Sequence, residues 1–197
     1  MIFSLIAILF SAIFHEYMHG WMADRLGDPT AKDAGRLTLN PLAHIDLYGS
    51  ILLPALIYFG TGGAMIFGYA KPVPYNPYNL RDQKYGSAKV AAAGPLANLI
   101  TALFFGLLLR FVPGISGTLA MLLSIIVQIN LILMVFNLIP IPPLDGSRVL
   151  VTFLPYKWQV RFAEFERYGM LFILLFVLFG FSIILPIINL LFRLIVG

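Results

Sequence analysis

The sequence has 197 residues, of which 60% are hydrophobic and only 11% are charged, and its mean hydropathy is +0.91. Soluble domains are about 45–50% apolar and about 25% charged, so this composition excludes a soluble globular protein. The chain has no cysteine, which excludes disulfides and thiolate ligands and leaves His, Asp and Glu to hold any metal. The net charge of +4 comes from basic residues scattered through loops. It therefore indicates membrane topology and argues against a nucleic-acid partner.

Uncharged runs of about 20 residues predict helices that span the membrane. Four runs meet this criterion clearly, at residues 2–23, 90–109, 118–140 and 168–192. The last run carries Gly180 and Pro186, which favour either one long kinked helix or a helix followed by a second membrane segment. We therefore expect an all-α polytopic membrane protein with about 4 to 6 transmembrane helices in a single domain over residues 1–197.

A fifth apolar run, at residues 47–70, is long enough to cross the membrane but is interrupted by Pro54, Gly60, Gly62 and Gly63. It is either one crossing helix or a re-entrant hairpin. If the run does not cross, 11 of the 13 basic residues lie on one face of the membrane, which is the asymmetry that cytoplasmic loops show. If the run crosses, that asymmetry largely disappears. The charge distribution therefore favours the re-entrant hairpin.

Two further segments are predicted to lie at the membrane surface. Residues 71–79 contain three prolines, which remove amide donors and favour an extended loop. Residues 157–167 alternate Trp158, Phe162 and Phe165 with basic residues, as a helix lying in the membrane interface would. A connecting loop with aromatic anchors is an equally good interpretation of this second segment.

Four ionisable residues lie beside or within apolar membrane sequence: His15, Glu16, His19 and Asp145. Charged groups at membrane depth are costly unless they are paired or bind a metal, so they indicate a functional site. His15 and His19 lie four residues apart and so share one face of a helix, where both imidazoles can reach one zinc ion. Glu16 lies about 100° around the helix and can reach a water beside that metal as a general base.

A catalytic zinc site usually has three protein ligands, so one ligand is missing from the first helix. His44 and Asp46 lie in a polar loop, where capping of the loop is the better interpretation. Asp145 is the better candidate, because it follows the proline-rich stretch at residues 137–144. Non-helical backbone at membrane depth is tolerated where it lines a cavity or is buried in protein, and this stretch would let Asp145 turn toward the first helix.

The His15-Glu16-Tyr17-Met18-His19 motif, together with Asn137-Leu-Ile-Pro-Ile-Pro-Pro-Leu-Asp-Gly146, resembles the site-2 protease family of intramembrane zinc metalloproteases. Three more segments are similar to the branch of that family without PDZ or CBS domains: residues 35–46, 67–74 and 93–98. The resemblance implies one zinc ion per chain, held by His15, His19 and Asp145, with Glu16 as the catalytic base. It also implies a catalytic core over about residues 1–150, a C-terminal membrane segment over about 165–197, and a site near the cytosolic face. The chain departs from many relatives at Leu47, where they have proline.

Asn98 and Asn137 lie near these polar groups and are candidates to donate to the carbonyl or oxyanion of a substrate. Hydrogen bonding between helices is the alternative role of an asparagine in a membrane. Ala91, Gly94 and Ala97 belong to a face of small residues that favours close helix packing.

The predicted function is therefore cleavage of peptide bonds in or near transmembrane segments of other membrane proteins, in the lipid bilayer of a bacterial or archaeal cell. A metal transporter or metal-binding membrane protein that uses the same ligands is the alternative. The spans carry almost no other charged group along a route across the membrane, and Glu16 has no evident use in a carrier. A catalytically silent scaffold is the third hypothesis, and the presence of all three ligands and the base argues against it.

Overall fold

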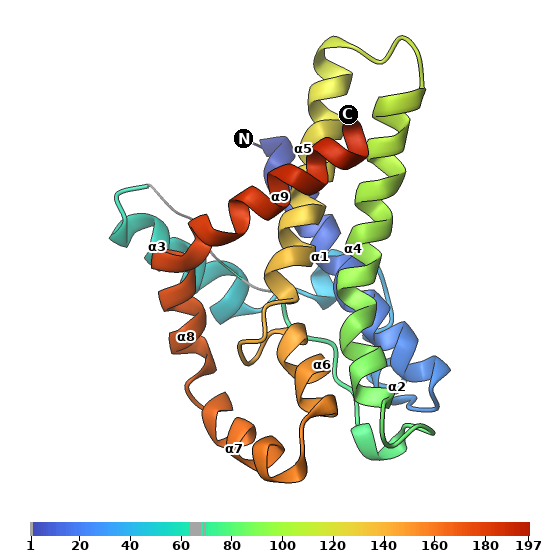
Figure 1. Ribbon diagram of the computed structural model, residues 1–197, viewed down its shortest axis with the longest axis vertical. Helices are drawn as coiled ribbons and strands as arrows, with labels where there is room; N and C mark the ends of the chain where they lie inside the picture. Colours follow the sequence, from blue (N-terminus) through green and yellow to red (C-terminus); the bar gives the residue numbers. More distant parts are fainter. Residues whose placement is uncertain (1, 64–67, 69) are drawn as a thin grey trace.

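The computed structural model describes residues 2–63, 68 and 70–197, and every regular element within them is a helix (Figure 1). The α-helices are α1 (Ile2–Arg25), α2 (Thr30–Asp33), α3 (Leu53–Gly60), α4 (Gly86–Phe111), α5 (Gly117–Asn137), α6 (Asp145–Phe153), α7 (Tyr156–Glu166), α8 (Gly169–Leu175) and α9 (Phe181–Val196). Short 3₁₀ turns lie at Pro41–Ala43 and Pro77–Asn79, and π-helical stretches lie at Leu47–Leu52 and Phe176–Gly180. The all-α architecture expected from the sequence is confirmed.

Four of these helical segments are long and apolar enough to cross a membrane: α1, α4, α5 and the continuous stretch Gly169–Val196. They coincide with the four runs predicted from the sequence, and the chain is an integral membrane protein. Helix α5 ends at Asn137, earlier than the apolar run suggested. Proline removes an amide donor and disfavours helical geometry in the preceding residue, so Pro140 and the prolines after it end the helix.

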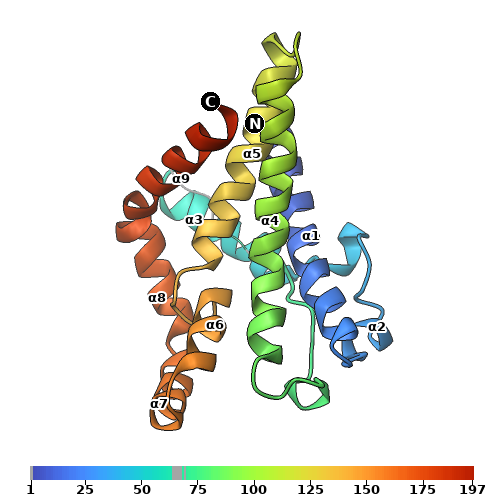
Figure 2. The ribbon, with the colours of Figure 1, turned by 45° about the vertical axis from the view of Figure 1, so that its right-hand side comes forward.

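The C-terminal span is one helix with a sharp bend, which decides between the two interpretations of this run. Helix α8 passes through the π-helical stretch Phe176–Gly180 into α9, and the two helices run in clearly different directions (Figures 1 and 2). A π-helical turn and an internal glycine are recognised causes of such kinks. The bend brings α9 against α4 and α5.

Helix α4 is the centre of the bundle and packs against α1, α5, α6 and α9 (Figure 2). Its buried face carries Ala91, Ala93, Gly94 and Ala97, as predicted for a face of small residues. Small side chains let helix backbones approach closely in a membrane. Toward the other end of α4, Ala102 joins a buried apolar cluster with Leu131 of α5 and residues of α9.

The apolar stretch at 47–63 forms six residues of π-helix and then the eight residues of α3. At about 1.5 Å of rise per residue this stretch is about 20 Å long, which is shorter than the hydrocarbon core of about 30 Å. Residues 64–67 and 69 lie outside the described residues, and with them part of the segment 67–74. Whether the whole run 47–70 turns back within the membrane therefore stays a prediction.

The segment at 157–167 is helical, since α7 covers Tyr156–Glu166 and has no buried residue. This confirms a helix in place of a plain connecting loop. Helix α7 lies at the end of the molecule away from the C-terminus, across the line of α8 (Figure 1). Its placement in a membrane interface stays a prediction.

The loop at 71–81 is fastened to the end of α1 through Asp28. Gly27 has φ +103° and turns the chain after the end of α1, and Asp28 is the next residue. The Asp28 carboxylate is fully buried and accepts hydrogen bonds from the backbone and hydroxyl of Thr30, the backbone N–H of Asn76 and the Asn79 amide. Burial acts to raise the pKa of Asp28, but these hydrogen bonds outweigh it and lower the pKa below its ordinary value.

Candidate metal centre

His15, His19 and Asp145 converge in the interior of the molecule, as the sequence predicted. Nε2 of His15 lies 3.0 Å from Nε2 of His19, and Asp145 Oδ2 lies 3.1 Å from the first and 3.3 Å from the second. In the described part of the chain they form one group of three side chains that could hold a metal ion. A tetrahedral zinc ion with bonds of 2.0–2.1 Å holds its ligand atoms about 3.3 Å apart, so the spacing fits zinc.

Asp145 reaches this position because the chain breaks between α5 and α6. Helix α6 starts at Asp145, which places the carboxylate in its first turn, where the helix dipole favours a negative charge. Gly146 allows the start of α6 to approach the end of α5 closely, as this position of Asp145 requires. A Cβ on Gly146 would collide with the Leu138 carbonyl just after the end of α5. Only a glycine therefore lets the start of α6 lie against the end of α5.

The hydrogen bonds of the two imidazoles leave their Nε2 atoms as acceptors. His19 Nδ1 lies 2.7 Å from the Val90 carbonyl, and His15 Nδ1 lies 2.6 Å from Asn98 Oδ1. A carbonyl oxygen accepts, so Nδ1 donates and the lone pair of Nε2 faces the other ligands. Asp145 Oδ2 is buried there and has no hydrogen-bond partner within the described residues. Three acceptors in contact with no donor between them are the arrangement that a bound cation stabilises.

Gly94 of α4 forms the floor of this centre. A Cβ at position 94 would lie 2.5 Å from His19 Nε2 and 2.6 Å from His15 Nε2. The imidazoles therefore occupy the space that any other residue at this position would fill. The small-residue face of α4 serves the site as well as helix packing.

Glu16 is held apart from the three ligands by the backbone of the loop. Its Oε2 accepts a hydrogen bond of 2.9 Å from the backbone N–H of Val73. Pro72 and Pro74 have no amide hydrogen, so Val73 is the single donor of that tripeptide. The loop thus fixes one oxygen of the Glu16 carboxylate, and Glu16 does not belong to the group formed by His15, His19 and Asp145.

The other candidate residues have separate partners. His44 Nε2 contacts the Thr38 carbonyl at 2.8 Å, and Asp46 caps the following helical turn through Gly49 N–H at 2.7 Å, so both hold the loop. Asn137 ends α5 and donates its amide to the Leu133 carbonyl at 2.9 Å. Asn98 lies behind His15, fully buried, with its carboxamide oxygen on Nδ1 and not on the side that faces Asp145. This position does not agree with the expected contact of Asn98 with substrate, because the His15 imidazole lies between Asn98 and the metal centre.

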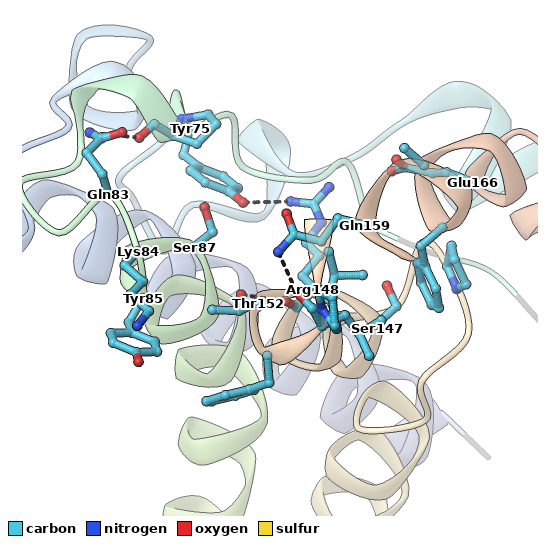
Figure 3. Close-up of a pocket in the computed structure, with 18 residues that line it drawn as sticks. Tyr75, Gln83, Lys84, Tyr85, Ser87, Ser147, Arg148, Thr152, Gln159 and Glu166 are labelled. Carbon is cyan, nitrogen blue, oxygen red and sulfur yellow. Dashed lines mark hydrogen bonds between the residues drawn. The ribbon is translucent and has the colours of Figure 1, made fainter. Parts of the chain in front are cut away.

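A groove of about 990 Å³ opens beside α6, between the segment 75–87 and helices α6 and α7 (Figure 3). Pro142 and Ser147, which lie before and after Asp145 in the sequence, belong to its lining. Arg148 of α6 donates to the Tyr75 hydroxyl at 3.2 Å and lies over the same ring, which ties α6 to the loop that holds Glu16 (Figure 3).

Comparison with known families shows which family this chain belongs to. The sequence model of Peptidase family M50 matches residues 3–117 and 114–180, which include both histidines, Glu16 and Asp145. The chain belongs to peptidase family M50. It is a zinc metalloprotease of the family that contains the site-2 proteases, as the motifs indicated.

Curated relatives of this M50 peptidase are named as zinc metalloproteases. YwhC of Bacillus subtilis is 37% identical over 93% of this chain and 84% of its own length. A relative from Methanocaldococcus jannaschii is 34% identical over 81% of this chain and 74% of its own length. Rip2 of Mycolicibacterium smegmatis is 32% identical over 83% of this chain, which spans 61% of that protein. No solved structure gives a significant match.

Three features of the M50 peptidase site were missed from the sequence. The role of Val73 had a signal in the sequence, because a residue between two prolines carries the one backbone N–H donor of that tripeptide. Asn130 also carried one, as an amide within an otherwise apolar membrane span. The need for glycine at position 94 had no local signal, because it depends on how α1 and α4 pack together.

Proposed function

We propose that this M50 peptidase is an intramembrane zinc endopeptidase that cleaves membrane proteins in or near their transmembrane segments. The observation that carries the proposal is the convergence of His15, His19 and Asp145 between the membrane helix α1 and the start of α6. In this proposal the three residues ligate one zinc ion. Two imidazoles and one carboxylate form a common ligand set of catalytic zinc, which keeps a fourth position open.

Glu16 acts as the general base in this proposal. Bound zinc supplies Lewis acidity, which polarises the scissile carbonyl and makes water more acidic. The Glu16 carboxylate accepts a proton from the attacking water and then delivers it to the nitrogen of the leaving amine. The Val73 N–H holds Oε2 of this carboxylate, so the other oxygen is the one that faces the water. Asn137, at the end of α5, is the candidate donor to the substrate carbonyl.

The substrate binds in extended form, because a helical segment has its carbonyls hydrogen-bonded within the helix. We assign the extended substrate to the groove beside α6, because Pro142 and Ser147 of its lining lie close to Asp145 in the sequence and its volume is large enough for several extended residues. We place the groove and the metal centre toward the cytosol, because with residues 47–70 as a re-entrant hairpin that orientation puts 11 of the 13 basic residues on the cytosolic side. The groove then receives the part of the substrate that leaves the membrane.

Mapping of new protein N-termini tests the proposal without a known substrate. Membranes from cells that express the parent or the Glu16→Gln variant are compared by mass spectrometry of free N-termini, after both purified proteins are shown to hold equal zinc. The parent should produce new N-termini within or beside transmembrane segments, and Glu16→Gln should not. Equal sets of N-termini would refute the proposed protease. Zinc uptake by proteoliposomes of both proteins would instead support the metal carrier.

A further inference from the structure

A chain of buried hydrogen bonds links the metal centre to two other helices. His15 Nδ1 bonds Asn98 Oδ1 of α4 at 2.6 Å, and Asn98 Nδ2 donates to Asn130 Oδ1 of α5 at 2.9 Å. Asn130 Nδ2 donates in turn to Ser11 Oγ of α1 at 3.0 Å. Both asparagines are fully buried, and Ser11 is 8% exposed. We refer to Ser11, Asn130 and Asn98 as the amide chain.

The direction of the amide chain is fixed by a backbone carbonyl. Asn130 Nδ2 also donates to the Ile126 carbonyl at 2.9 Å, and a carbonyl can only accept. The Asn130 oxygen must therefore face Asn98, which must present its own NH₂ to Asn130 and its oxygen to His15. A second carbonyl, that of Ser11, lies 3.5 Å from the same Asn98 NH₂ and favours the same orientation. His15 is thereby required to donate from Nδ1 and to keep the Nε2 lone pair toward Asp145.

The two histidines are held by different means. His19 Nδ1 donates to a main-chain oxygen, that of Val90, which no substitution removes. His15 depends on a side chain that itself depends on another side chain. Outer partners of this kind orient metal-ligating histidines, and their loss costs about 10–100-fold in metal affinity. A buried amide without its partners is also costly, so the amide chain is stable only when complete.

We infer that Asn98 is a positioning residue that holds His15 as a metal ligand, and that Asn130 fixes the direction of the Asn98 amide. This role replaces the contact of Asn98 with substrate that the sequence suggested. The inference rests on the zinc site of the proposed function. It adds Asn98 and Asn130 to that site as residues that affect zinc binding by holding His15 in place.

Zinc affinity of the purified full-length chain in detergent tests the inference, measured by competition with a chromophoric chelator. Asn98→Leu removes the acceptor from His15 and should weaken zinc binding about 10–100-fold. Asn98→Asp keeps an oxygen opposite Nδ1 and should bind more tightly than Asn98→Leu. Asn130→Leu leaves Asn98 in place but without its anchor, and its loss should be intermediate.

Thr101→Val is the matched control, because Thr101 lies one turn further along α4 and its hydroxyl donates to the Ala97 carbonyl of its own helix at 2.9 Å. It should bind zinc like the parent. The visible absorption of the Co²⁺-loaded proteins gives a second readout, since it reports ligand geometry: Asn98→Leu should change the spectrum and Thr101→Val should not.

Equal zinc affinity of Asn98→Leu and the parent would overturn the inference, as would an equal loss in Thr101→Val. Either result leaves the proposed protease standing. A parent that binds zinc but cleaves nothing would refute the protease and leave the role of Asn98 intact.

Discussion

Substitution of Gly94 by alanine is the sharpest single test of the metal centre. The added Cβ would lie 2.5 Å from His19 Nε2, whereas ordinary contacts of this kind begin at 3.4 Å, so the atoms must separate by about 0.9 Å. Ligand distances in metal sites hold to within about 0.2 Å. The imidazoles are fixed on their other sides by Val90 and Asn98 and have little room to move. We therefore expect Gly94→Ala to weaken zinc binding more than about 100-fold, beyond the effect of losing an outer partner.

The assay is zinc per chain and chelator competition on the purified protein, beside its thermal unfolding with the metal removed. Gly60→Ala in α3 makes the same chemical change where the new Cβ meets no atom of the described residues within 4 Å, and it should bind zinc like the parent. Parent-like zinc affinity in Gly94→Ala would refute the packing of α4 against the two histidines that the structure describes.

Three further predictions concern the structure around the site. Gly146→Ala should also abolish zinc binding, because its Cβ would force the start of α6, and with it Asp145, away from the end of α5; metal analysis showing a full zinc complement would contradict this. Leu131→Ala should lower the free energy of unfolding in detergent by about 2–5 kcal/mol, because Leu131 is fully buried between α4, α5 and α9. Asp28→Asn should lower it by about 1.5–3 kcal/mol near neutral pH, because a buried charged acceptor is lost. Since the fold lowers the pKa of Asp28, its contribution is fully present above the unfolded pKa of 3.8 and is lost as the pH falls through the lower pKa of the folded state. The difference between parent and variant should therefore shrink as the pH falls below 3.8, and a difference that stays constant in acid would argue against the carboxylate as its source.

Much of this molecule follows from local rules of sequence. The four spans are predicted because each needs about 20 uncharged residues, and the end of α5 is predicted to within three residues by Pro140. His15 and His19 are predicted as a pair because residues four apart share a helical face. Asp145 is predicted because an acidic residue after a broken membrane helix needs a partner.

The remaining contacts depend on how the helices are rotated against each other, which no local pattern specifies. The sequence shows that Asn98 and Asn130 are amides at membrane depth, but not that they meet each other or that the first faces His15. It shows that Val73 is a lone donor, but not that Glu16 receives it. These contacts join residues 32 to 83 positions apart, and they form only when α1, α4, α5 and the loop have docked.

The position of Asp145 has a consequence for the lifetime of the protein in a cell. The chain has no cysteine, so no disulfide joins its two halves, while a metal at this centre would link His19 to a residue 126 positions later. A ligand that binds only the folded state adds stability in proportion to the logarithm of its concentration over its dissociation constant. The association of α6 with α1 is thereby linked to the supply of zinc. We expect metal-starved molecules to open more often at this junction and to be degraded first, so that the cellular amount of the protein follows the zinc available to it.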